Sequence, residues 1–257
     1  QDNEVARLAV DIGGTFTDVV LEDKGKQFIS KVLTTSASPE KGVLEGVMEV
    51  LKEAQIEASK IGVFLHGTTL ATNAIIERKG ALTAMVTTEG FRDVLEIGYE
   101  SRYNQYDVMI EKPNALVPRS RRFTVPERID VKGKVLTHLD EEALNSLLRL
   151  FLDCEAESIA VGFLHSYVNP THERRVKEFI MEKLPHLYVS ISSEVCPEVR
   201  EFERFTTTSA NAYVKPLMAR YLGALEARLD TLGVCCPMLL MTSGGGLMTV
   251  EMAREFP

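Results

Sequence analysis

The segment DIGGTFTDVV, Asp11–Val20, directly follows a short apolar run. The apolar run reads as a strand, Gly13–Phe16 as a turn, and the residues after the turn as a hairpin partner. This register places Asp11 directly opposite Asp18, where two like charges destabilise a hairpin. A bound cation such as Mg²⁺, which prefers oxygen ligands, would offset the repulsion. Asp11 and Asp18 are therefore candidate metal ligands.

The turn itself has the composition of an anion site. Its two glycines leave backbone N–H groups open to close approach, and its threonines add hydroxyl donors. Together with the carboxylates, these groups fit the phosphates of a Mg-nucleotide. A Gly-Gly pair alone would favour the alternative, an ordinary hairpin turn with solvated acids. The residues expected to contact the nucleotide are Asp11, Gly13, Gly14, Thr15 and Thr17.

The bulk composition restricts the class of protein. The chain has 257 residues, a net charge of −8 and a hydrophobic content of 45%. An acidic balance argues against a nucleic-acid surface, which needs clustered Lys and Arg. No signal-peptide pattern and no apolar run of about 18 residues occurs, so we expect a cytoplasmic protein without a membrane partner. None of the four cysteines has the CxxC spacing typical of a metal site.

Strand and helix signals alternate along most of the chain. After three N-terminal strands, Ser38-Pro39-Glu40 has the pattern of a helix start, and Asp140 is a candidate cap for a later helix. Apolar residues at helical spacing predict a long helix over 209–232, with Pro216 starting, kinking or splitting it. A hairpin start followed by α/β alternation predicts a mixed sheet with helices on its faces.

Residues 99–139 interrupt this alternation. Three prolines fall within them, the helical period is lost, and Lys132-Gly133 is typical of a hairpin turn. We therefore expect an inserted β-rich segment. The predicted divisions are 1–98, 99–139 and 140–257.

Longer motifs carry a resemblance to a known family. The segment VDIGGTFTDVVL resembles the first phosphate loop of the actin-like ATPase superfamily. The segments at 66–100 (HGTTLATNAIIERKG…), 162–175 (GFLHSYVNPTHERR) and 207–222 (TTSANAYVKPLMARYL) resemble the A-type subunit of the ATP-dependent hydantoinase/5-oxoprolinase family, in the family's order. The resemblance extends over essentially the whole chain.

This resemblance implies a fold and a reaction. The fold would be the actin-like, ribonuclease H-like α/β fold, and the cofactors ATP and Mg²⁺. The reaction would be ATP-driven opening of a cyclic amide such as hydantoin, N-methylhydantoin or 5-oxoproline, together with a B-type subunit. Family members are far longer, with a second phosphate loop and an adenosine-binding segment downstream. We therefore expect this chain to be a fragment that works with the remainder of the A-type polypeptide. The alternative is that another chain supplies the rest of the nucleotide site.

Two further segments are candidates for the site. His66-Gly67-Thr68-Thr69 lies between a predicted strand and a predicted helix, where open N–H groups and the helix dipole favour an anion. A histidine there would shuttle protons or stabilise a phosphorylated intermediate, whereas the structural alternative is a buried histidine and a helix cap. The second segment is a glycine-rich strand exit or another anion-facing loop. The residues concerned are His66, Thr68, Thr69 and Asn73 as catalytic candidates, and Ser243, Gly244 and Gly245 as cofactor-binding candidates.

Two other functions stay open at this point. Acetone and acetophenone carboxylases share the subunit architecture and use ATP to activate a ketone or bicarbonate. A non-catalytic nucleotide-binding module of actin-like fold is the third possibility.

Overall fold

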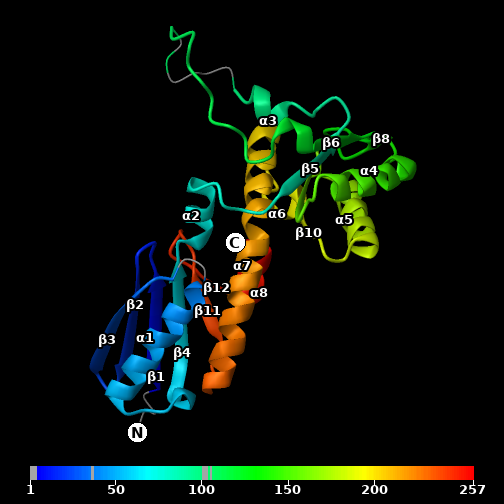
Figure 1. Ribbon diagram of the computed structural model, residues 1–257. Helices are drawn as coiled ribbons and strands as arrows, with labels where there is room; N and C mark the ends of the chain where they lie inside the picture. The colour runs from blue at the N-terminus through cyan, green and yellow to red at the C-terminus, as the bar shows by residue number, and fades with distance from the viewer. Residues whose placement is uncertain (1–4, 36–37, 100–103, 105) are drawn as a thin grey trace. The chain divides into compact units, whose positions relative to one another are not determined.

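The computed structural model describes residues 5–35, 38–99, 104 and 106–257 (Figure 1). The chain forms two compact units: unit 1 combines Gln1–Glu77 with Leu217–Pro257, and unit 2 is Arg78–Pro216. These units do not follow the predicted divisions after residues 98 and 139. The reason is that the chain returns to unit 1 after residue 216 and adds its last strands to the first sheet.

Unit 1 is built on a six-stranded mixed sheet with the order β12-β11-β4-β1-β2-β3. β1, β2 and β3 form an antiparallel meander, whereas β4 and β11 run parallel to β1. The predicted hairpin register is confirmed, since Asp11 pairs with Asp18. The strands are β1 (Ala6–Ile12), β2 (Phe16–Asp23), β3 (Lys26–Leu33), β4 (Ile61–Thr68), β11 (Met238–Met241) and β12 (Leu247–Thr249).

The core of unit 1 lies on one face of this sheet. Burial alternates along β1, so Leu8, Val10 and Ile12 are buried while Asp11 points to the other face. α1 packs against the buried face, where Gly46 lets it approach Val19 closely. The C-terminal part of α7 and α8 complete this core. The helices of unit 1 are α1 (Pro39–Ala54), α2 (Leu70–Ile76), α8 (Val250–Glu255) and the end of α7 (Glu201–Leu232).

Unit 2 is built on a four-stranded sheet with the order β10-β9-β5-β6, in which all pairs are parallel. The expected β-rich insertion is not separate from this sheet, because β6 pairs with β5. The predicted hairpin turn is present: β7 and β8 pair around Gly133, whose φ is +82°. The strands are β5 (Thr83–Thr88), β6 (Arg122–Val125), β7 (Arg128–Ile129), β8 (Val135–Thr137), β9 (Ser158–Gly162) and β10 (Tyr188–Ile191).

The helix after Asp140 and the long helix containing Pro216 are both present, and the second begins earlier than predicted. Asp140 caps α4 as expected, because its carboxylate accepts hydrogen bonds from two backbone N–H groups. The long helix α7 begins at Glu201 rather than at residue 209 and contains Pro216 in its interior. Its first turns lack a simple apolar stripe because adjacent Arg204 and Phe205 are both fully buried. The other helices are α3 (Val94–Ile97), α4 (Glu141–Asp153), α5 (Thr171–Lys183) and α6 (Ser192–Val195).

Among the described residues, no helix is both long enough and apolar enough to cross a membrane.

Candidate functional site

Three turns of unit 1 lie at one edge of its sheet (Figure 1). β1, β4 and β11 are parallel, so their carboxyl ends meet at this edge. The strand register places Val10, His66 and Leu240 in one row across the sheet. Each of the three strands ends in a turn or helix start shortly after that row. In open α/β sheets, ligands bind beyond the carboxyl ends of the strands. The β1–β2 turn, the β4–α2 junction and the β11–β12 turn therefore form one candidate site.

Hydrogen bonds from Thr34, which follows β3, fix the β1–β2 turn, although no sequence signal indicates this residue. The Thr34 hydroxyl donates to the Gly13 carbonyl at 3.0 Å, and the Thr34 N–H donates to the Thr15 carbonyl at 2.9 Å. Gly13 is tightly packed, since a Cβ atom there would lie 3.1 Å from the Phe16 carbonyl oxygen. Gly14 and Thr15 are exposed at the tip. The turn therefore presents its backbone to solvent in a fixed conformation.

Thr17 does not contribute to this exposed surface. Its side chain is fully buried, and its hydroxyl lies 3.0 Å from the Thr34 hydroxyl. Direct contact between Thr17 and a nucleotide, which the sequence predicted, is therefore inconsistent with the structure. Thr17 instead supports the turn from the core side.

The two aspartates differ in their surroundings. Asp18 forms an ion pair with Lys31 of β3, with Nζ and Oδ1 3.0 Å apart, so part of the repulsion predicted from the sequence is offset within the chain. Asp11 is exposed and lies over Gly67 of the neighbouring strand. The described residues include no cluster of three or more His, Cys, Asp or Glu side chains that could hold a metal. A Mg²⁺ ion bound with nucleotide needs only one or two carboxylates, because phosphate oxygens and water complete its shell. The residues present fit such an ion, with Asp11 the better placed ligand.

The β4–α2 junction lies against the β1–β2 turn. The Thr69 hydroxyl donates to the Ile12 carbonyl at 3.3 Å, and Asn73 Nδ2 donates to the Thr69 hydroxyl at 3.2 Å. Asn73 Nδ2 would lie 3.7 Å from a Cβ atom at Gly14. The Thr68 hydroxyl accepts from the Leu70 N–H at 3.2 Å, which is a local turn contact rather than an open donor. Thr69 and Asn73 are thus the junction residues that reach the turn.

His66 occupies the core rather than the site edge. It is fully buried, and its Nδ1 lies 3.3 Å from the Val10 carbonyl, which can only accept a hydrogen bond. Nδ1 therefore carries the proton, and Nε2 accepts from the Tyr221 hydroxyl at 2.7 Å. Desolvation lowers the pKa of His66 to about 4. Because both nitrogens are bonded and the ring is neutral, the structure favours the structural alternative over the predicted proton-shuttle role.

The β11–β12 turn has the geometry of a tight hairpin. The Gly245 N–H donates to the Thr242 carbonyl and the Gly246 N–H to the Thr242 hydroxyl, both at 2.9 Å. Gly245 adopts a φ of +83°, which favours glycine. Ser243 and Gly244 are exposed at the tip, at the same sheet edge as the β1–β2 turn. This turn is therefore a peripheral part of the candidate site.

Comparison with known proteins now adds to this geometry. Residues 7–184 match the model of the hydantoinase/oxoprolinase N-terminal region, and residues 204–257 match the hydantoinase/oxoprolinase model. The chain belongs to the hydantoinase/oxoprolinase family. The resemblance drawn from the sequence motifs is thereby confirmed.

Three relatives illustrate the family. The chain is 32% identical to the caprolactamase subunit alpha of Pseudomonas jessenii over 97% of its own length. It is 32% identical to the acetophenone carboxylase gamma subunit of Aromatoleum aromaticum over 93%, and 33% identical to 5-oxoprolinase 1 of Arabidopsis thaliana over 94%. These alignments span 37%, 35% and 21% of the respective relatives. The chain thus spans between about a fifth and slightly more than a third of the length of these relatives.

A solved structure supports the fold assignment. The crystal structure of the ATP-dependent caprolactamase from Pseudomonas jessenii matches with a TM-score of 0.85, over 94% of this chain and 36% of that one. Together with the strand order of unit 1, this match confirms the predicted α/β fold of the actin-like type.

Proposed function

We propose that the complete hydantoinase/oxoprolinase-family protein uses ATP to open a cyclic amide. In this proposal, the carboxyl edge of the unit 1 sheet supplies one side of the ATP site. The observation that carries it is the position of Asp11. Its exposed carboxylate stands at the base of a fixed, open glycine turn, opposite Asp18 and over Gly67.

Each residue of this edge has a proposed role. Asp11 binds Mg²⁺, and Asp18 is a secondary ligand once it separates from Lys31. The exposed backbone and hydroxyl of Gly14 and Thr15 donate to phosphate oxygens. Asn73 and Thr69 fix the turn from the β4–α2 junction, and Ser243 and Gly244 line the edge of the site. The bound Mg²⁺ would neutralise charge on the phosphates.

The chemistry follows from the weak reactivity of an unstrained lactam, whose nitrogen is a poor leaving group. Transfer of the γ-phosphoryl group to the amide oxygen releases ADP and makes the ring carbon electrophilic. Water then adds to that carbon, and the C–N bond breaks to release the ring nitrogen as an amine and leave an acyl phosphate. A second water hydrolyses the acyl phosphate to a carboxylate and inorganic phosphate, which completes the ring-opened amino acid. Most of the acceleration would come from positioning and charge neutralisation.

The same proposal includes partners. The names of two relatives identify them as an alpha and a gamma subunit, so we infer that this protein works with a B-type subunit. The remainder of an A-type polypeptide would supply the second phosphate loop and the adenosine contacts. Because ATP is a cytoplasmic substrate, we place the protein in the cytoplasm.

A second candidate is ATP-dependent carboxylation of a ketone, which the acetophenone carboxylase relative supports at the same identity as the caprolactamase. ADP release by the complete protein with its co-purifying subunits distinguishes the two. Stimulation by ε-caprolactam, hydantoin or 5-oxoproline without bicarbonate is the expected result. Stimulation only by acetophenone plus bicarbonate would establish the carboxylase instead. ADP release that responds to neither would contradict both enzymes.

A further inference from the structure

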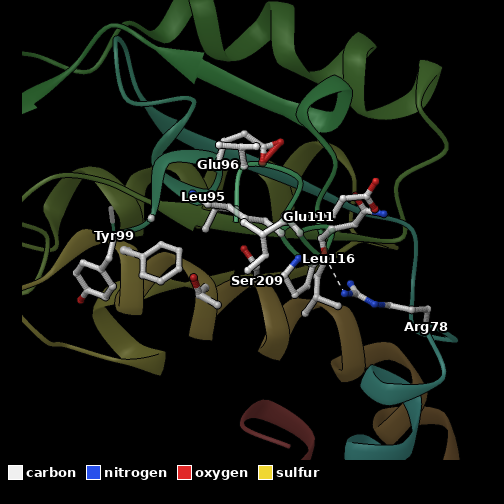
Figure 2. Close-up of a pocket in the computed structure, with 16 residues that line it drawn as sticks. Arg78, Leu95, Glu96, Tyr99, Glu111, Leu116 and Ser209 are labelled. Carbon is white, nitrogen blue, oxygen red and sulfur yellow. Dashed lines mark hydrogen bonds between the residues drawn. The ribbon is translucent and has the colours of Figure 1, made fainter. Parts of the chain in front are cut away.

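Unit 2 contains a cavity whose lining includes none of the residues of the phosphate-loop edge. It lies between α3, the segment 108–116 and the first turns of α7, and its volume is about 840 Å³ (Figure 2). Small-molecule sites have volumes of roughly 300–1,000 Å³. All the residues that line the cavity belong to unit 2.

Apolar side chains form most of its wall. Leu95, Leu116 and Phe202 line it, and Tyr99 packs edge-on against Phe202 with ring centroids 5.3 Å apart. Leu95 in turn packs against a buried cluster. The wall is therefore backed by a fixed core and suits the apolar body of a ligand. The cluster behind Leu95 consists of Met85, Val117, Ala160, Phe205 and Ala212.

Two polar groups of the lining are placed to orient a ligand. Ser209 is only 2% exposed, and its hydroxyl donates over a long distance of 3.9 Å to the sulfur of Met85, a weak acceptor. Glu96 also lines the cavity, with Oε1 3.5 Å from Nη2 of the buried Arg122. Neither terminal nitrogen of Arg122 has a hydrogen-bond partner among the described residues. A ligand carbonyl oxygen can therefore accept from the serine hydroxyl, and a ligand amide N–H can donate to the glutamate carboxylate.

The charged side chains of the lining balance, with two cations and two carboxylates. Arg78 donates to the Asn114 carbonyl at 2.7 Å and Lys112 to the Ile97 carbonyl at 3.2 Å, so both cations already hold the wall together. Figure 2 shows the Arg78 contact as a dashed line at the edge of the cavity. Glu96 and Glu111 add negative charge. A phosphate or carboxylate ligand would meet as much negative as positive charge, so the lining gives an anion no net attraction.

We propose that this cavity captures the uncharged carbonyl substrate, a lactam or a ketone with an apolar body, with Ser209 bonding to its polar group. The proposal rests on the proposed function, because it names the substrate class of that enzyme. It predicts that neutral ε-caprolactam binds better than 5-oxoproline, which carries a carboxylate. The amide N–H of a lactam would also give Glu96 a donor that a ketone lacks.

The test is calorimetric binding of ε-caprolactam to the complete protein without nucleotide. Ala115→Trp fills the cavity and is expected to raise the Kd at least about tenfold. Ser209→Ala removes one oxygen and is expected to raise it about threefold to tenfold. Leu136→Trp, at a position 58% exposed on β8, is the matched control and should leave the Kd unchanged.

Unchanged ε-caprolactam binding in both cavity variants would overturn the proposal, as would tighter binding of 5-oxoproline than of ε-caprolactam. A parallel assay of ATP turnover keeps this result distinct from the proposed function. Lactam-stimulated turnover that Ala115→Trp leaves unaltered would remove the cavity assignment while the enzyme assignment stands. The opposite case is a protein whose ATP turnover does not respond to lactams. If Ala115→Trp still abolishes ε-caprolactam binding there, the cavity assignment is supported while the enzyme assignment is not.

Discussion

The carboxylate of Asp11 occupies the space above Gly67, so that a Cβ atom at position 67 would lie 3.0 Å from Asp11 Oδ1. The two residues are partners in the parallel pairing of β1 and β4. The absence of a side chain on one strand thus determines where a carboxylate on the next strand can lie. The position of Asp11 is central to the proposed ATP site.

Gly67→Ala should displace that carboxylate at little cost in stability, because the end of the aspartate side chain can rotate away. We expect ATP turnover to fall by about tenfold or more, with the unfolding midpoint nearly unchanged. Gly223→Ala is the control: it lies inside α7, and its Cβ would be 3.6 Å from the nearest atom, Arg254 Nη2. It should keep full turnover and stabilise the protein by about 0.5–1 kcal/mol. Equal ATP turnover in the two variants would show that turnover does not depend on the position of the Asp11 carboxylate above Gly67.

The burial of His66 predicts a pH dependence of stability. Its pKa falls from 6.5 to about 4 on folding, so between these values the unfolded chain binds the proton and the folded chain does not. Stability should therefore be independent of this group above pH 6.5 and fall as the pH drops from 6.5 to 4. The slope is up to about 1.4 kcal/mol per pH unit. Urea unfolding at several pH values measures it.

A His66→Gln variant is the control for that slope. Glutamine does not titrate, so the part of the pH dependence that belongs to His66 should vanish, even though the variant is less stable throughout. An identical slope in both proteins would mean that the histidine is not buried in its neutral form.

The ion pair between Lys31 and Asp18 predicts a change in metal dependence. Both side chains are about half exposed (56% and 47%), so Lys31→Met should change the free energy of unfolding by less than about 1 kcal/mol. It frees Asp18 beside Asp11, and the Mg²⁺ concentration for half-maximal ATP turnover should fall severalfold. Lys60→Met removes the same charge at an exposed position outside the sheet. A Mg²⁺ titration that is the same in both variants would argue against Asp18 as a ligand.

Thr34 predicts a specific effect on nucleotide affinity. Thr34→Val keeps the shape of the side chain but removes its bond to the Gly13 carbonyl and its contact with Thr17. We expect a loss of about 1 kcal/mol in stability and a rise in the KM for ATP larger than any change in kcat. A variant with the wild-type KM would show that the turn is fixed by other contacts.

The sequence predicted the β1–β2 hairpin well because its determinants are local. Alternating burial sets the register, and the Gly-Gly pair sets the turn, so the Asp11–Asp18 pairing followed without any long-range information. The same is true of the Asp140 cap. The sequence could not predict the partners that cross the chain. Lys31 reaches Asp18 only through the pairing of β2 with β3.

Two further outcomes depend on partners that are remote in sequence. The sequence left both a catalytic and a buried His66 open, and the contact that decides between them is with Tyr221, 155 residues away. The division into units depends on β11 pairing with β4, which is equally remote in sequence. Thr17 was misassigned because a hydroxyl in a glycine turn looks like a ligand donor until its burial beside Thr34 is known.

The most direct test of the central claim is Mg-ATP binding and lactam-dependent ADP release by the complete protein carrying Asp11→Asn. This change keeps the size of the side chain and removes the charge that would bind Mg²⁺. ADP release is expected to fall by about 100-fold or more, while the unfolding midpoint and ε-caprolactam binding stay at wild-type values. Wild-type ADP release in this variant would contradict the assignment of the β1–β2 turn as the ATP phosphate site.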